Sequence, residues 1–574
     1  MSLLKQWRHL LLAAFAIVAL GALAACGDDD DDSGGSPTAT GASGAPTDLA
    51  PDSEQKMTIN IRAEPGSIDP QAQGYTYEAT VVNTLYMTLF WQDPETSGLT
   101  PRAALEVPTV ENGGISADNL TYTIKLNPDL TWSDGTPVTA ADFVYGIQRG
   151  FNLNIAVNYG GFFTNLKGGD AAIAEDPTAT DYVAKIQADL AEGVVAVDDH
   201  TLKLVADHAS ASFLANFVLP INSAVKQSNV ETVGETFGTA AGAAQMLTNG
   251  FYMVKEWTAG DHLTLVPNPY YKIGHAAYIK EMTMTFTEDQ NQAFTALQAG
   301  QTDEAPVPPT SLAGVKNDPA LHQESEFGMR WIYVDVTLPP WDKPDFVIGI
   351  NQATDREAIA RDVYQGVRAP LFAPCLEGVL GCDQSIFQDL DFDLEKAKAS
   401  VAKAYPAGTA IPEITLEIVN DPTTQSLGQT LQSQWQQIPG VKVSIVTTDQ
   451  NTLVADMKAH KSGTQISGWQ MDYADASDLW TLFLSTNVNT NKGFWNRPDY
   501  DTFVKQQDGQ FDQTERLATL KQLQELMAKD PPAIFFSSQT RTNLFSVKVK
   551  GIVESPFDFE VIGDNFLEEM YISK

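Results

Sequence analysis

The chain has 574 residues and a formal net charge of −37, from 36 Lys and Arg against 73 Asp and Glu. With 43% hydrophobic and 9% aromatic residues it has a globular composition and the length for several domains. The acidic balance disfavours nucleic-acid binding, because such a surface repels a phosphate backbone, and 3 cysteines exclude both a disulfide scaffold and a multi-cysteine metal cluster.

The first residues have the pattern of an export signal. Lys5 and Arg8 precede an apolar run at 10–20, which is too short to cross a membrane, and small residues follow as far as Cys26. We therefore expect residues 1–25 to be a cleaved signal peptide. The position of Cys26 resembles the lipobox of bacterial lipoproteins, in which the cysteine is acylated. This resemblance implies a lipid anchor on the outer face of the cytoplasmic membrane, the periplasmic side where the host has two membranes; the alternative is an ordinary signal with a stray cysteine.

A low-complexity segment follows the signal. Residues 26–56 contain an aspartate run at 28–32 and then mainly Ser, Gly, Pro, Thr and Ala, a composition that cannot bury a core. We predict a disordered tether over 26–56. The aspartate run lacks the turns and spaced ligands of a cation site and is interpreted as part of this tether.

From residue 57 onward the hydrophobic pattern predicts mixed α/β structure. Strands are expected at 57–61, 122–126 and 194–205, the last folded back at 198–200. A hydroxyl followed three residues later by an acid predicts helix starts at Thr139 and Thr354, the second helix ending near Gly366. Further on, 414–419, 426–437 and 441–446 have the pattern of strand, helix and strand, hence a parallel pair with a right-handed crossover. A last helix is expected at 518–529.

Motifs of catalysis are absent from the sequence. It has no phosphate-binding loop, dinucleotide fingerprint, nucleophile elbow or HExxH motif, and its 7 histidines lack metal-ligand spacing. Carboxylate pairs are expected by chance among 73 acids, so they do not argue for a glycosidase. We expect no enzymatic activity, no cofactor and no metal site, with a secreted glycoside hydrolase as a remote alternative. Cys375 and Cys382, in an exported loop rich in Pro and Gly, predict a local disulfide.

A series of motifs in one order covers nearly all of residues 57–574. They are EPGSIDP at 64–70, TYTIKL at 121–126, LTWSDGTPVTAADFVY at 130–145, NGFYMV at 249–254, NPYY at 268–271, LQAG at 297–300 and GWQMDY at 468–473. Together they resemble the bacterial extracellular solute-binding proteins of the dipeptide, oligopeptide and nickel importer family. The stretch 130–145 is the most specific of them.

The resemblance implies a two-lobed, three-domain fold of the periplasmic-binding-protein type. Residues 57–88, 226–327 and 546–574 would form domain I and residues 89–225 domain II of one lobe, and residues 328–545 would form domain III, the other lobe. A ligand would bind between the lobes and close the hinge. An ABC permease in the membrane would then receive the ligand from this protein, which we expect to be a monomer.

The same resemblance implies a peptide site. The aspartate matching Asp472 binds the α-ammonium group of a short peptide, and backbone groups near the position of Trp469 pair with the extended ligand. Weaker matches along the cleft are Gln470, Gln73, Tyr75, Gly328, Trp331 and Tyr333. The alternatives are a surface-loop acid at 472 and plain core packing at 469.

The sequence departs from the peptide-binding pattern at several positions. Gln73 and Tyr333 stand where peptide binders of the family carry acids, and Met457, Ile466 and Gln425 stand where they carry basic groups for peptide C-termini. We therefore keep other readings open: an oligosaccharide stacked on the aromatic residues, a metal chelate, or a role as a sensor that binds signalling peptides rather than nutrients. The expected function remains peptide capture for an ABC importer.

Overall fold

The computed structural model describes residues 46–156, 165–448, 452–453, 456, 459, 461, 463–485 and 495–574. Within them, Thr47–Lys574 form one compact unit. The predicted signal peptide and Cys26 lie outside the described residues. In the described part, no helix has the length and hydrophobicity that crossing a bilayer requires, and no cluster of His, Cys, Asp or Glu is arranged to hold a metal ion.

The folded unit begins before residue 57, where the predicted tether was expected to end. The buried side chain of Gln55 donates to the carbonyls of Ala50 at 3.0 Å and Ile572 at 2.8 Å and accepts from the Ile572 N–H at 2.9 Å. Strand β1 (Lys56–Ile61) starts directly afterwards. The predicted tether over 26–56 is therefore wrong from Thr47 onward, because this stretch finds backbone partners at the far end of the chain that its composition does not reveal.

One sheet is built on β1. Its strand order is β1-β9-β8-β7, with β1 parallel to β9 and the other pairs antiparallel. The later strands are β7 (Tyr252–Thr258), β8 (His262–Pro267) and β9 (Glu281–Phe286). Helix α2 (Thr76–Leu85), which is buried over most of its length, packs against β7. This region therefore combines the start of the chain with a segment some 200 residues later in the sequence.

A second, antiparallel sheet carries the predicted hairpin. It has the order β4-β6-β5, from β4 (Thr121–Lys125), β5 (Val194–Asp198) and β6 (Thr201–Val205). The fold-back at 198–200 is confirmed. Helix α3 (Ala140–Gly150) begins at Thr139, whose N–H and hydroxyl donate to Asp142 at 2.8 and 3.0 Å, so this predicted cap is also confirmed.

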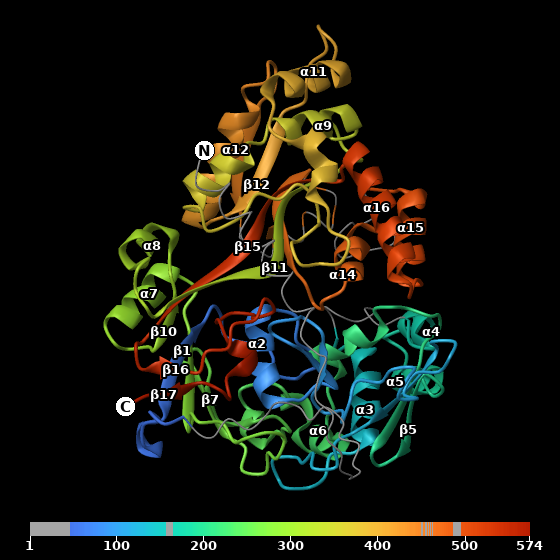
Figure 1. Ribbon diagram of the computed structural model, residues 1–574, viewed down its shortest axis with the longest axis vertical. Helices are drawn as coiled ribbons and strands as arrows, with labels where there is room; N and C mark the ends of the chain where they lie inside the picture. Colours follow the sequence, from blue (N-terminus) through green and yellow to red (C-terminus); the bar gives the residue numbers. More distant parts are fainter. Residues whose placement is uncertain are drawn as a thin grey trace, which may run out of the picture. The chain divides into compact units, whose positions relative to one another are not determined.

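The sheet that carries the predicted site has the order β10-β15-β11-β14-β12-β13. The strands are β10 (Glu304–Pro306), β11 (Leu321–Val334), β12 (Ile414–Val419), β13 (Val443–Thr448), β14 (Thr464–Gln470) and β15 (Ala533–Phe545). The long strands β11 and β15 run antiparallel, side by side (Figure 1). Strands β12 and β13 pair in parallel around α12 (Pro422–Trp435), which confirms the predicted parallel pair.

Side chains of β11 alternate between two apolar cores, one on each face of this sheet. Met329, Trp331 and Tyr333 pack with helices α14 (Ala476–Trp480), α15 (Pro498–Asp508) and α16 (Gln513–Lys529). Ile332 and Val334 pack on the other face with α9 (Pro344–Gln352), α11 (Leu394–Ala404) and α12. Successive side chains of β11 thus point to opposite faces of a sheet that is buried on both sides. The face on which a residue lies therefore determines whether it can reach a ligand.

The predicted cap at Thr354 is wrong by one residue. The carboxylate of Asp355 accepts the Ala358 N–H at 2.9 Å, while the Thr354 hydroxyl donates back to the Ile350 carbonyl at 2.7 Å. Helix α10 (Arg356–Ala358) continues as a wider π-helical turn at Ile359–Val363, and Gly366 follows with φ +81°. Aspartate is the stronger capping acceptor here, since the threonine is already bonded to the preceding helix.

The remaining elements lie around these sheets. Short strands are β2 (Phe90–Gln92), β3 (Leu99–Pro101), β16 (Val549–Lys550) and β17 (Tyr571–Ile572). The other helices are α4 (Gly169–Ala174), α5 (Tyr182–Asp189), α6 (Gln227–Val233), α7 (Gln290–Gln298) and α8 (Pro309–Val315).

Candidate ligand site

A buried carboxylate joins the two strongest sequence predictions. Asp478, on the short helix α14, is 1% exposed, and its Oδ2 accepts the indole N–H of Trp469 at 3.3 Å and the backbone N–H of Asp472 at 3.0 Å. Burial raises the pKa of Asp478 well above its ordinary value, and the nearby charge of Asp472 raises it further. Trp469 and Asp472 are both partly exposed. The end of β14, which carries Trp469, and the following loop, which carries Asp472, are therefore held together by one carboxylate.

An ion pair stabilises this loop. Asp475 caps α14 by accepting the Ser477 N–H at 2.8 Å, and its carboxylate bonds Arg516 of α16 at 2.5 and 2.8 Å. The guanidinium of Arg516 also donates to Gln507 Oε1 at 2.8 and 3.0 Å. Because Arg516 and Gln507 are buried and hydrogen-bonded to each other, this network supports the loop that carries Asp472.

Asp472 lines a cavity that is built from distant parts of the sequence. Its other lining residues are Trp91, Gln92, Val218, Leu219, Met471, Ser555, Phe557, Phe559 and Asn565. Apolar and aromatic side chains predominate, and Asp472 is the carboxylate among them. The cavity is small, about 20 Å³, so in this structure it marks where Asp472 meets apolar side chains of distant segments rather than enclosing the volume of a peptide. No local pattern in the sequence marks Trp91 and Phe559, because these residues meet only through tertiary folding.

Gln470 and Gly328 shape the backbone beside Trp469. The side-chain amide of Gln470 donates to the Asp558 carbonyl at 2.6 Å. Gly328 pairs with Gln470 across the strands, and a Cβ at position 328 would lie 2.5 Å from Nε2 of Gln539. That amide nitrogen donates to the Trp469 carbonyl at 3.0 Å. Because Gly328 has no side chain, the Gln539 amide can lie beside it and donate to the backbone carbonyl of Trp469.

Trp331 and Tyr333 are packed inside the protein. They are 3% and 6% exposed, and the Trp331 ring lies 6.0 Å from the rings of both Phe483 and Phe535. Their flat faces are therefore covered by neighbouring side chains in this structure. Direct contact of either residue with a ligand remains a prediction.

Gln73 and Tyr75 belong to a loop held by one glutamate. The carboxylate of Glu78 accepts the N–H groups of Gly74 at 2.7 Å, Tyr75 at 3.2 Å and Gly66 at 3.0 Å, and burial raises the pKa of Glu78. Gln73 is buried, whereas Tyr75 is 51% exposed and stacks on Tyr77 with ring centroids 5.3 Å apart. Of these two residues, Tyr75 is the one whose side chain is exposed to solvent.

The structure describes two of the three positions at which this chain lacks the basic groups of the family's peptide binders. Ile466 pairs with Ile332 and packs against the apolar core, and Gln425 is hydrogen-bonded to Asn420 at 2.8 Å. Met457 lies outside the described residues. On the face of the sheet that holds Ile332, Arg330 pairs with Gly468. No sequence pattern marks Arg330, because a lone arginine in a strand carries no motif.

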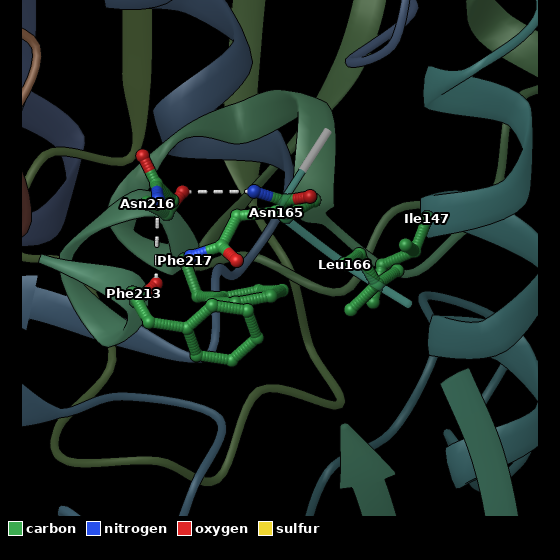
Figure 2. A pocket seen from close by; sticks show the side chains of 7 residues that line it. Ile147, Asn165, Leu166, Phe213, Asn216 and Phe217 are labelled. Carbon is green, nitrogen blue, oxygen red and sulfur yellow. Dashed lines mark hydrogen bonds between the residues drawn. The ribbon is translucent and has the colours of Figure 1, made fainter. Parts of the chain in front are cut away.

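A second cavity lies beside α3, away from every predicted site residue (Figure 2). Phe213 and Phe217 lie on one side of it, with Leu166 and Ile147 on the other. Two of its asparagines bond backbone carbonyls: Asn222 reaches the carbonyl of Asn216 at 2.8 Å, and Asn216 that of Phe213 at 3.4 Å. With its amides engaged in this way, the cavity is a gap in the packing rather than a second ligand site.

The cysteine loop packs against α16. Cys375 and Cys382 form a disulfide in the structure. Gln524 on α16 donates to the Gly381 carbonyl at 2.8 Å and accepts the Asp383 N–H at 2.9 Å. The disulfide therefore closes a loop that the helix also holds by hydrogen bonds.

Comparison with known protein families assigns the chain to one of them. The model described as "Bacterial extracellular solute-binding proteins, family 5 Middle" matches residues 101–491. The chain belongs to this family of solute-binding proteins. The family consists of binding proteins, which agrees with the expectation that the chain is not an enzyme.

Individual relatives are similar to this chain along almost their whole length. Oligopeptide-binding protein OppA of Bacillus subtilis is 26% identical over 534 residues, covering 89% of this chain and 93% of the relative. The probable deoxycholate-binding periplasmic protein YgiS of Escherichia coli is 24% identical over 537 residues, covering 92% and 95%. The solved structure of the murein tripeptide binding protein MppA of Escherichia coli matches with a TM-score of 0.75 at 23% identity, covering 92% of this chain and 100% of that one. The predicted fold class is thereby confirmed.

Proposed function

We propose that this family 5 protein is the substrate-binding component of an ABC importer and captures short peptides for a membrane permease. The observation that carries the proposal is Asp472, held on a rigid loop at the edge of a mostly apolar cavity. The names of similar proteins, an oligopeptide-binding and a murein tripeptide binding protein, support a peptide ligand. A relative of similar identity is named as a probable deoxycholate-binding protein, so similarity alone does not fix the ligand.

The chemistry of the site fits the amino end of a peptide. An ammonium group that leaves water requires a charged hydrogen-bonding partner, and Asp472 supplies one. The neighbouring aromatic and apolar residues exclude water, which strengthens that attraction. Edge groups of the backbone after β14 can pair with an extended peptide without reading its sequence.

We further propose that the protein works at the membrane surface as a monomeric lipoprotein. Residues 1–25 would be removed, and an acylated Cys26, carrying for example palmitate, would anchor the chain. The tether then ends where the folded unit begins at Thr47, so its typical reach is about 25 Å rather than the length expected for the longer segment. Closure of the expected lobes, residues 328–545 against the rest, would present the loaded form to the permease.

Replacement of Asp472 by asparagine tests the peptide site. We expect Asp472→Asn to weaken binding of tri-alanine by roughly 2–5 kcal/mol in titration calorimetry, since it removes the charge that faces the ligand ammonium. Acetylation of the tri-alanine amino group should weaken binding to the unaltered protein to a similar degree. Asp129→Asn, the same change at an exposed aspartate, is the matched control and should bind like the unaltered protein.

Two results would contradict this proposal. Equal affinity of Asp472→Asn and the control for tri-alanine would remove Asp472 from the site. Tight binding of deoxycholate or maltotriose, with no response to peptides, would replace the peptide by another solute while leaving the transport role in place.

A further inference from the structure

One aspartate joins two regions that the resemblance assigns to opposite lobes. Oδ1 of Asp508, the last residue of α15 and part of the lobe expected at 328–545, accepts the hydroxyl groups of Ser210 at 3.0 Å and Ser212 at 2.8 Å. The backbone carbonyl of Asp508 accepts the Ala211 N–H at 2.7 Å. Both serines are buried. Three consecutive residues of the other expected lobe thus bond to one residue, which follows Ser210 by 298 positions.

The same carboxylate oxygen also bonds the helix behind the candidate site. It accepts the hydroxyl of Ser477 on α14 at 3.2 Å. The Ser477 hydroxyl in turn accepts N–H groups from the side chains of Gln507 at 2.8 Å and Arg516 at 3.2 Å. Arg516 belongs to the network that supports the loop of Asp472. The contact at Asp508 is therefore continuous with the support of the candidate site.

The segment that contains the two serines also reaches the cavity itself. A few residues further along this segment, Val218 and Leu219 line the cavity together with Asp472. Asp508 lies on a helix and not on β11 or β15, the strands by which the chain enters and leaves the lobe expected to carry it. Proximity along the chain therefore does not enforce this contact, and the segment meets that lobe both at Asp508 and at the cavity.

A contact of this kind stabilises the arrangement in which the two regions meet. Hydrogen bonds to a charged group contribute more to stability than bonds between neutral groups. When the regions separate, water takes the place of each partner and this contribution is lost. Because the apparent affinity of a ligand rises with the fraction of protein in the binding-competent state, residues that never touch a ligand can determine how tightly it is held.

We propose that Ser210, Ser212 and Asp508 form a latch that holds the loaded protein closed and sets the rate at which the ligand leaves. The inference rests on the proposed function, because it requires that residues 328–545 close over a ligand against the rest of the chain. None of the three residues lines the cavity that the structure describes at Asp472. They are positioning residues, which act through the lobes and through the loop of Asp472.

Removal of both serine hydroxyls tests the latch and leaves α14, α15 and α16 unaltered. In the double variant Ser210→Ala and Ser212→Ala we expect tri-alanine to dissociate at least about fivefold faster, measured by stopped-flow tryptophan fluorescence, with a nearly unchanged association rate. The control is the double variant Ser228→Ala and Ser426→Ala, which removes two exposed hydroxyls and should behave like the unaltered protein.

The melting temperature distinguishes a latch from a permanent structural contact. In protein freed of ligand by unfolding and refolding, the latch is open, so the double variant and its control should melt at the same temperature. A purely structural contact would lower the melting temperature of the ligand-free double variant and leave the dissociation rate of tri-alanine unchanged. That result would overturn the proposal.

A cross-link separates the latch from the peptide function. The ligand-free double variant Ser212→Cys and Asp508→Cys is oxidised, mass spectrometry verifies the disulfide, and small-angle X-ray scattering measures the radius of gyration. We expect a smaller radius than for Ser212→Cys alone, because the cross-link closes an open protein. An equal radius would overturn the latch, since the two positions would then already meet without a ligand. If tri-alanine fails to bind at all, the peptide function is wrong, and a smaller radius still supports a latch that closes over a different ligand.

Discussion

Glu304 is a carboxyl group that the fold keeps protonated at neutral pH. It lies on β10 with no exposed surface, and its oxygens accept the Asn60 N–H at 3.2 Å and the side-chain amide of Asn543. Burial raises its pKa from 4.5 to about 8, although both hydrogen bonds act in the opposite direction. The desolvation cost therefore outweighs the hydrogen bonds, and the neutral acid is the stable form.

This predicts a stability that falls as pH rises. Below pH 4.5 the carboxyl is protonated in folded and unfolded chains, and its contribution is fully present; between pH 4.5 and about 8 only the unfolded chain releases the proton. In Glu304→Gln the free energy of unfolding should decline less over pH 5–8, by at least about 1 kcal/mol, than in the unaltered protein. Denaturant titrations at several pH values measure this, with the exposed Glu235→Gln as control. Parallel pH profiles for Glu304→Gln and the unaltered protein would refute the assignment.

For single residues, the sequence suggested candidates for the site but not what surrounds them in the folded chain. Asp472 and Trp469 were proposed from the resemblance, and the structure holds both through the buried Asp478. Nothing in the sequence indicated that Trp331 would be buried, because alternation along β11 assigns it to a core only after the partner strands are known.

Helix α3 approaches a neighbouring segment closely at Gly146. A Cβ at this position would lie 2.1 Å from the carbonyl oxygen of Ser223, which no rotamer can relieve. We expect Gly146→Ala to lower the free energy of unfolding by about 1–3 kcal/mol, measured by denaturant unfolding. The control is Gly314→Ala in α8, where a Cβ meets open space, and this change should stabilise by about 0.5–1 kcal/mol. If both substitutions stabilised the protein, the close contact of α3 would be disproved.

The disulfide should stabilise the loop that it closes. Replacing both Cys375 and Cys382 by alanine should cost about 2–3 kcal/mol of unfolding free energy, because the unfolded chain gains freedom. Reducing agent should lower the stability of the unaltered protein to a similar extent and leave the double variant unchanged. A reductant effect of equal size in both proteins would show that the loss does not come from this disulfide.

Element boundaries were predictable where one local interaction decides them. Thr139 and Asp142 satisfy each other within a single turn, so the start of α3 was visible in the sequence. The start of α10 was displaced, because Thr354 bonds the preceding helix and Asp355 takes over as cap. Local patterns thus fail where a tertiary neighbour competes for the same side chain.

For the whole molecule, the fold class followed from the motif series, and the family comparison confirms it. The cavity at Asp472 did not follow, because its lining comes from residues near 91, 218, 471 and 557 that no sequence pattern connects. The early start of the folded unit was likewise hidden, since Gln55 finds its partner at Ile572. The assigned domain boundaries remain predictions.

Native mass spectrometry of the purified chain lacking residues 1–26 tests the central claim most directly. Spectra before and after denaturation would identify any ligand that is retained from the cell. The account predicts a series of bound masses that equal sums of amino-acid residues. A single bound mass that fits hexose units, a bile acid or a metal chelate would contradict peptide capture.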